Sequence, residues 1–174
     1  MITSTFLHAD LSHLLGNMFF LYFFGRKVED LLGAWQFALL YLACTFISGI
    51  GSVVGGTTLP LTQGRIPGLG ASGAVTGVMA AYLFLYSEQR IRTLVMVVFP
   101  IPFIIKMPVW TFIVYTVVRD VMGGWLEQEI QALGYMYSLV GSFAHLGGFV
   151  GGMLCIYLLL PAEVLHYRHR PTKL

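Results

Sequence analysis

Long runs of apolar residues without charged side chains constrain this chain more than any other feature. Residues 35–54 hold no charged side chain, and residues 130–162 hold no Asp, Glu, Lys or Arg and a single histidine, His145. A helix that crosses a bilayer needs about 20 mostly apolar residues. Charged residues make up only 10% of the chain, against about 25% in soluble domains. Too few charges are available to cover a soluble surface, so the sequence predicts an integral membrane protein.

The apolar stretches and the breaks between them predict an all-α fold, a polytopic transmembrane helix bundle that forms a single domain over residues 1–174. About five spans are expected, at residues 11–24, 35–54, 71–87, 107–121 and 138–160. Residues 92–105 contain Pro100 and Pro102, and proline removes a helical hydrogen bond. These residues are expected to be a kinked extension or an interfacial piece. Residues 119–140 are predicted to form a movable cover, with a short helix hinged at Gly123 and Gly124.

The basic residues predict the orientation of these spans. If the spans alternate, seven basic residues fall on one side and two, Arg65 and Arg119, on the other. The seven are Arg26, Lys27, Arg90, Arg92, Arg168, Arg170 and Lys173. Cytoplasmic loops carry the excess of Lys and Arg. The C-terminus is therefore expected to be cytoplasmic, and the first, third and fifth spans start on the outer side.

Unusual polar residues cluster at the starts of those three spans. They are His8, His13, Asn17, Ser72 and His145. Polar groups inside a bilayer are costly and are usually paired or functional. Their shared position, in the outer half of the membrane, indicates a site.

Ser72 follows a glycine-rich turn in "GLGASGAVTG" and opens a helix. The first N–H groups of a helix lack internal partners and favour negative charge. A hydroxyl there can act as a nucleophile beside ready oxyanion donors. The alternative interpretation is a helix-capping serine among small packing residues.

His13 and Asn17 share one helix face in "HADLSHLLGN", because they are four residues apart. Two stacked donors can hold an oxyanion; the alternative is a polar contact between helices. A zinc site is less well supported, since there is no HExxH pattern.

His145 shares its helix face with Gly148 and Gly152, and Gly73 and Gly77 form a matching pair after Ser72. Glycines allow close helix approach, so the third and fifth spans are expected to pack here and bring His145 toward Ser72. A histidine beside a serine is a minimal base and nucleophile. No carboxylate lies well inside the spans, because Asp10 and Asp120 lie at segment ends. A dyad is therefore expected; the alternative is a buried histidine in a helix contact.

These three motifs, in this order, resemble those of the rhomboid intramembrane serine proteases. "HADLSHLLGN" is similar to the HxxxxHxxxN motif, "GASG" to GxSG and "AHLGGFVGG" to AHxxGxxxG. The resemblance covers essentially the whole chain and implies a rhomboid-like bundle.

The resemblance also implies residue roles. Ser72 resembles the nucleophile and His145 its general base, while His13, Asn17 and the Ser72 N–H resemble the oxyanion donors. The supporting residues would be His8, Gly70, Gly73, Gly148 and Gly152. The implied reaction is hydrolysis of peptide bonds in or near transmembrane segments of membrane proteins, helped by helix-destabilising residues in the substrate. The implied surroundings are the lipid bilayer, and the resemblance implies no cofactor.

Two departures from the family pattern stand out. The chain starts at what looks like the end of the family's first long loop, so the first of six helices and nearly all of that loop are expected to be missing. A fragment, a misassigned start and a reduced protein all fit this expectation. Thr76 stands one turn after Ser72, where many members have an aromatic residue that packs on the histidine.

Other functional classes compete with proteolysis. A non-proteolytic relative that binds transmembrane clients would usually lack the serine or histidine, and both are present. A small-solute channel or transporter is a third class. The net charge of +2 gives no basic surface for nucleic acid. Cys44 and Cys155 lie in apolar runs, which argues against a disulfide framework or a thiolate metal site.

Overall fold

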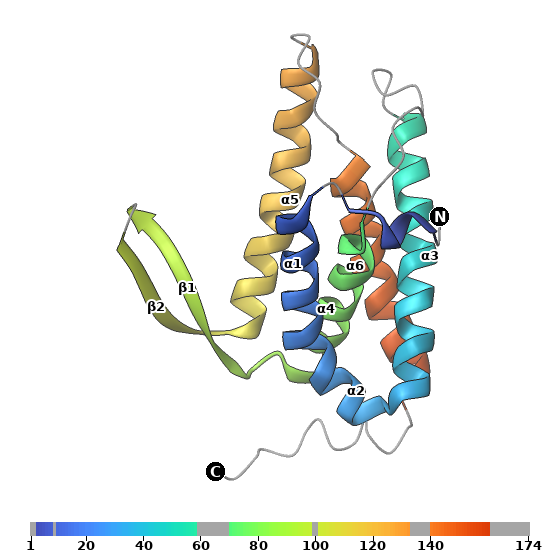
Figure 1. Cartoon of the computed structure of the whole chain (residues 1–174), viewed down its shortest axis with the longest axis vertical. Helices are drawn as coiled ribbons and strands as arrows, with labels where there is room; N and C mark the ends of the chain where they lie inside the picture. Colours follow the sequence, from blue (N-terminus) through green and yellow to red (C-terminus); the bar gives the residue numbers. More distant parts are fainter. Residues whose placement is uncertain (1–2, 9, 59–69, 99–100, 133–139, 161–174) are drawn as a thin grey trace.

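The chain folds into an elongated helical bundle with a β-hairpin projecting from one side, as the computed structural model in Figure 1 shows. The structure describes residues 3–8, 10–58, 70–98, 101–132 and 140–160. The elements are η1 (Thr3–Phe6), α1 (Leu11–Phe20), η2 (Leu21–Gly25), α2 (Arg26–Leu32), α3 (Ala34–Thr58), α4 (Ser72–Tyr86), β1 (Arg90–Val98), β2 (Ile101–Pro108), α5 (Val109–Ala132) and α6 (Val140–Leu159). η1 is a 3-10 turn and η2 is a π-helical turn.

The helices lie where spans were predicted, but two of them run much further. Helical structure in the first segment continues past Arg26 and Lys27 to Leu32, through α1, η2 and α2. Lys and Arg are good helix formers, so the end of the apolar run does not end the helix. Gly33 ends it with a φ of +83°, which glycine adopts without steric penalty.

α5 is the second helix that runs much further than predicted. It is continuous through Gly123 and Gly124 to Ala132. The predicted hinge and separate short helix within residues 119–132 are therefore wrong, because the i to i−4 hydrogen bonds of a long helix tolerate two glycines at a modest cost. The rest of the predicted cover, residues 133–139, lies outside the described residues.

Residues 90–98 and 101–108 form the two strands of an antiparallel hairpin, so the expectation of an all-α fold is wrong here. Arg92 pairs with Lys106 and Val98 with Ile101 across the two strands. The predicted kinked helix extension over residues 92–105 does not form. β-branched residues favour extended structure, and prolines are excluded from a helix interior, so this stretch pairs as strands instead.

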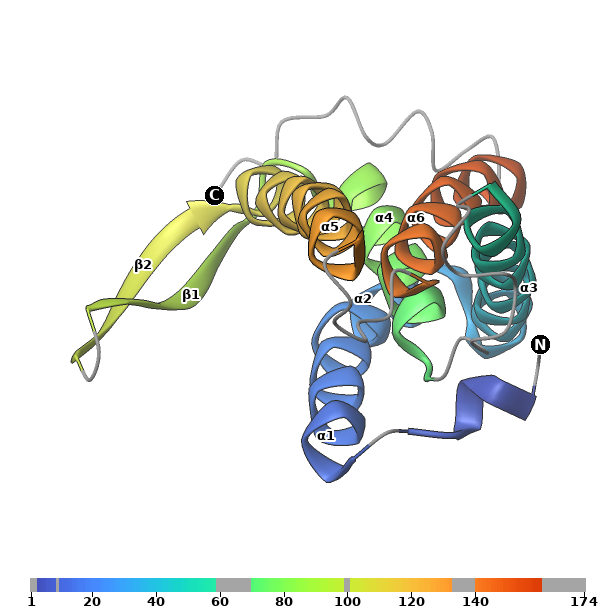
Figure 2. The same ribbon diagram turned by 90° about the horizontal axis from the view of Figure 1, so that it is seen from above.

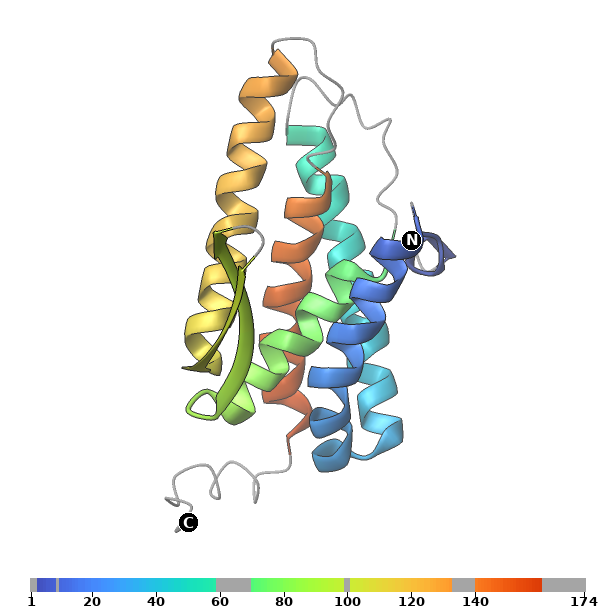
Figure 3. The same cartoon turned by 60° about the vertical axis from the view of Figure 1, so that its left-hand side comes forward.

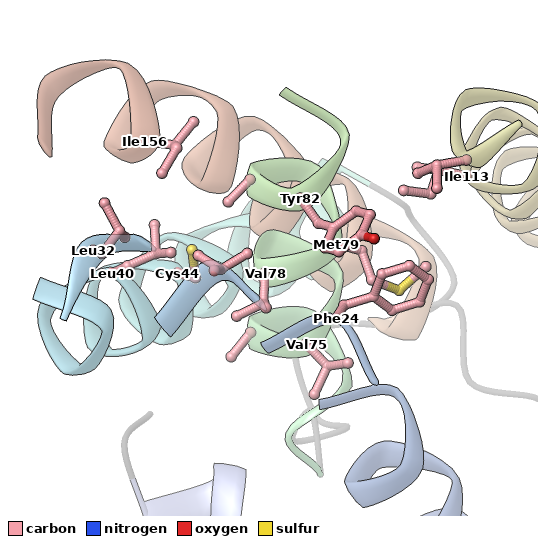
Figure 4. Close-up of a cluster of buried hydrophobic side chains, with 14 of the residues drawn as sticks. Phe24, Leu32, Leu40, Cys44, Val75, Val78, Met79, Tyr82, Ile113 and Ile156 are labelled. Carbon is pink, nitrogen blue, oxygen red and sulfur yellow. The ribbon is translucent and has the colours of Figure 1, made fainter. Parts of the chain in front are cut away.

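α4 is the central helix of the bundle. It contacts α3, α5, α6 and the α1–η2–α2 segment, and Figure 2 shows those helices arranged around it. Figure 3 shows that α4 runs obliquely to its neighbours. Every residue from Gly73 to Tyr82 is buried. Around α4 the core joins side chains of several helices, among them Phe24, Leu40, Cys44, Val78 and Ile156 (Figure 4).

Many large apolar side chains are exposed on the surface of the bundle. Large exposed side chains include Leu11, Phe19 and Tyr22 on the first helix, Tyr115 and Met122 on α5, and Leu158 on α6. Two described helices, α3 over Ala34–Gly55 and α6 over Gly141–Leu159, are long and apolar enough to cross a bilayer, and α4 is a shorter apolar helix. Exposed apolar surface of this extent fits a lipid environment.

Candidate active site

Asp10 fixes the start of α1, the helix that carries His13 and Asn17. It is the N-cap residue, and its carboxylate accepts a hydrogen bond from the His13 N–H at 2.8 Å. Hydrogen bonds from the Ser12 hydroxyl and the His13 N–H hold the pKa of the Asp10 carboxyl below its ordinary value. This cap sets where the helix begins, and thus the height at which His13 and Asn17 lie.

His13 and Asn17 both lie against Gly70, in the turn before α4. A Cβ built on Gly70 would be 2.8 Å from His13 Cε1 and 3.7 Å from Asn17 Nδ2. Gly70 also has a φ of +104°, a conformation that other residues rarely adopt. The "GASG" turn therefore needs glycine here for both reasons. The structure brings the first and second motifs together.

Two polar atoms at this point are buried and have no hydrogen-bond partner in the described part of the chain. Among the described residues, neither Asn17 Nδ2 nor His8 Nε2 has a hydrogen-bond partner. The His8 ring packs edge-on against His13, with 5.3 Å between ring centroids. A buried donor without a partner costs about 1–3 kcal/mol. An amide that remains there, facing the serine turn, is available to a ligand atom.

Ser72 is the first residue of α4, and Ala71 is the N-cap. The interpretation of Ser72 as the N-cap residue is therefore wrong, because that position belongs to Ala71. Ala71 has no side-chain cap to offer the first N–H groups of the helix, so those of Ser72 and Gly73 remain donors. Thr76, one turn on, donates its hydroxyl to the Ser72 carbonyl at 2.8 Å.

α4 and α6 meet backbone to backbone through their glycines, as the sequence predicted. A Cβ on Gly148 would overlap the Gly73 carbonyl, and one on Gly152 would overlap the Gly77 carbonyl. A Cβ on Gly73 would be 3.0 Å from the carbonyl oxygen of Ala144. The residue after Ser72 thus lies against the residue before His145. The prediction that these two helices pack here is confirmed.

His145 has a partner that the sequence analysis missed. Its Nδ1 lies 2.8 Å from Oδ2 of Asp120 on α5. The expectation that no carboxylate orients this histidine is wrong for the described structure. Asp120 was placed at the end of a span, on the same outer side as His145. This shared position on the outer side was the one signal in the sequence for the pair. The residues next to Asp120 and next to His145 in the sequence gave no further indication.

The three predicted motifs thus converge at the start of α4. His13 and Asn17 border Gly70, and the backbone beside His145 borders Gly73. Within the described ranges, no hydrogen bond joins the Ser72 hydroxyl to His145, and catalytic hydrogen bonds are often long before substrate binds. In the same part of the chain, no group of three or more His, Cys, Asp or Glu side chains could hold a metal ion.

Comparison with known proteins gives the class of this bundle. The sequence matches the Rhomboid domain over residues 1–162. It is 32% identical over 154 residues to the human "Presenilin-associated rhomboid-like protein, mitochondrial", an alignment that covers 88% of this chain and 36% of that protein. It is 32% identical over 159 residues to "Rhomboid-like protein 11, chloroplastic" of Arabidopsis thaliana, covering 91% of this chain and 51% of that protein.

The chain belongs to the rhomboid family of membrane proteins. A third relative is "RHOMBOID-like protein 12, mitochondrial" of Arabidopsis thaliana, 30% identical over 133 residues, covering 70% of this chain and 37% of that protein. The chain spans about a third to a half of the length of these relatives. No solved structure matches it.

Proposed function

We propose that this chain is an intramembrane serine endopeptidase that hydrolyses peptide bonds in or near transmembrane segments of membrane proteins. Family membership supports a membrane-protein substrate. The observation that carries the proposal is the convergence at the start of α4, where Gly70 lies against His13 and Asn17 and Gly73 lies against Ala144. These contacts support a site at the start of α4 in which Ser72 would be the nucleophile, His145 the base, and His13 and Asn17 oxyanion donors.

The proposed reaction begins with attack by Ser72 Oγ on the scissile carbonyl while His145 Nε2 accepts the hydroxyl proton. The oxyanion that forms would be held by the Ser72 N–H and the side chains of His13 and Asn17. His145 then gives the proton to the leaving amine. Water hydrolyses the acyl-enzyme with His145 again as base, which regenerates Ser72.

The expected substrates carry residues that destabilise a transmembrane helix. In a regular helix each amide is hydrogen-bonded and shielded, so the bond must unwind before Ser72 can attack it. The orientation remains a proposal from the basic residues: the site would face the extracytoplasmic side and the C-terminus the cytoplasm. The five-span single domain is proposed from the apolar stretches and the breaks between them.

Labelling with a fluorophosphonate tests the proposal directly, because the probe reacts covalently with an activated serine. The full chain in detergent or liposomes should take up the probe, and Ser72→Ala should abolish both labelling and cleavage of a membrane substrate. His145→Ala should do nearly the same, since serine is a poor nucleophile without a base. Ser87→Ala makes the same change at the opposite end of α4 and should label normally.

Folded wild-type protein that never takes up the probe would contradict the proposal. So would cleavage that persists in Ser72→Ala. The alternative function would then be favoured, that of a rhomboid relative that binds transmembrane clients without cleaving them.

A further inference from the structure

The contact between Asp120 and His145 joins two helices at the candidate site. Asp120 is on α5 and His145 on α6, and their side chains are 11% and 24% exposed. The 2.8 Å separation of Nδ1 and Oδ2 is that of a strong hydrogen bond. A carboxylate sheltered to this degree needs partners, and His145 is one of them.

Arg119 is the second partner of the carboxylate, and it uses the other oxygen. Its Nη2 and Nε donate to Asp120 Oδ1 at 2.8 and 3.3 Å. Oδ1 thus faces the Arg119 guanidinium, and Oδ2 faces the His145 ring. The two oxygens have separate partners, so the carboxylate has little freedom to rotate.

An ionised carboxylate only accepts hydrogen bonds. His145 Nδ1 must therefore carry the proton of this contact, which leaves Nε2 of the neutral ring with its lone pair. That is the tautomer a general base needs. The contact also fixes the rotation of the ring about its own axis.

We propose that Asp120 is a positioning residue that holds His145 in the Nδ1–H tautomer, with Arg119 orienting the carboxylate. This inference rests on the proposed function, because it assigns His145 the role of base. Asp120 would not touch the substrate. Its effect would pass entirely through the imidazole, giving the site a third member drawn from α5.

The decisive variant is Asp120→Asn, which keeps the size of the side chain. Arg119 offers only donors, so the amide oxygen should stay with Arg119 and the NH₂ group should face His145. An NH₂ group there donates to Nδ1, which moves the ring proton to Nε2. The base can then no longer accept a proton from Ser72. The kcat for a membrane substrate should fall by about 100-fold or more, with KM within about twofold.

A second substitution tests the direction of the amide. Arg119→Ala alone should lower kcat by about fivefold at most, because an exposed ion pair is weak. In the double variant Arg119→Ala/Asp120→Asn the amide can turn its oxygen toward Nδ1. The double variant should therefore recover at least about tenfold in kcat over Asp120→Asn. A merely structural role would give losses that add, with no recovery. Asp30→Asn makes the same change at an exposed aspartate of α2 and should leave kcat unchanged.

Nitrogen NMR of the wild-type protein labelled with ¹⁵N-histidine gives a readout without substitution at Asp120. The His145 signals, assigned by their loss in His145→Ala, should show a protonated Nδ1 and an unprotonated Nε2. An Nε2–H tautomer in the wild type would overturn the proposal. So would a kcat of folded Asp120→Asn equal to that of the wild type, or a kcat of the double variant no higher than that of Asp120→Asn. Wild-type fluorophosphonate labelling distinguishes the failure of this inference from the failure of the proposed function. If the wild type is labelled while these tests fail, the protease activity is supported and the positioning role of Asp120 is rejected.

Discussion

α4 is held on its two sides by different kinds of contact. Toward α6 it meets backbone with backbone, and Gly148 leaves no room for a single added carbon beside Gly73. Toward the first helical segment it meets large side chains, with the Phe24 and Tyr82 rings packed edge-on at 5.0 Å between centroids. A backbone contact cannot adjust, whereas side chains can repack. In the proposed site, the rigid contact would align Ser72 with His145, and the outer part of α1 would reach them from the adaptable side.

The largest effect should come from filling the rigid contact. Gly148→Ala places a methyl group on the Gly73 carbonyl, so α4 and α6 must separate. We expect fluorophosphonate labelling to disappear and the free energy of unfolding to fall by about 3 kcal/mol. The control is Gly141→Ala in the same helix, where no atom of the described residues lies within 4 Å of the added carbon. Equal behaviour of the two variants would mean that the close approach does not matter.

Removing a proposed oxyanion donor from the adaptable side should harm turnover and spare the fold. Asn17→Ala should lower kcat by about 100- to 1000-fold, as loss of one oxyanion donor does elsewhere. Because the Asn17 NH₂ group has no partner among the described residues, its loss should leave the thermal midpoint in detergent unchanged or raised. His13→Ala should show a similar kinetic loss. A large drop in the Asn17→Ala midpoint with normal kcat would instead favour a polar contact between helices.

The side-chain contact should tolerate change better. Phe24→Leu keeps an apolar group against Tyr82 and should cost about 1 kcal/mol in the free energy of unfolding. Activity should remain within a few-fold, because the neighbouring side chains can close around the smaller one. Denaturation and turnover should be measured on the same preparation. A complete loss of labelling in this variant would contradict the claim that the side-chain contact of α4 tolerates change better than its backbone contact.

The smallest effect should come from the cap of α1. The pKa of Asp10 is lowered in the folded protein by the Ser12 and His13 hydrogen bonds, so its contribution to stability is present above its ordinary pKa of 3.8. That contribution is lost as pH falls through the lower, folded value. The thermal midpoint should therefore decline in that acidic range. Asp10→Asn, which can still cap the helix, should lack this part of the decline.

The sequence predicted the contacts made by residues that recur at helical spacing. Glycines at positions 73 and 77 and at 148 and 152 are each four apart, and that interval marks one helix face whatever surrounds it. His13 and Asn17 follow the same rule. The lengths of the first helical segment (α1, η2 and α2) and of α5 were less predictable, since apolar character ended at Arg26 and around Asp120 while the helical structure continued.

Other features depended on contacts between distant segments. Asp120 and His145 are 25 residues apart, on different helices, and their pairing depends on how α5 and α6 rotate against each other. The hairpin is similar, because the stretch with Pro100 and Pro102 was expected to be a kinked helix extension or an interfacial piece. Its strands are defined by pairing with each other, and periodicity within one short apolar run does not reveal that pairing.

The shortness of α4 has a consequence for which bond is cut. With 15 residues it is about 22 Å long at 1.5 Å per residue, against a hydrocarbon core of about 30 Å. If its Tyr86 end reaches one face of the bilayer, Ser72 lies well beneath the other. The enzyme proposed here would then select the scissile bond first by its depth below the membrane surface and only second by the side chains around it. Moving a substrate's flanking charges by a few residues should move the cut along its sequence and leave the depth of the cut unchanged.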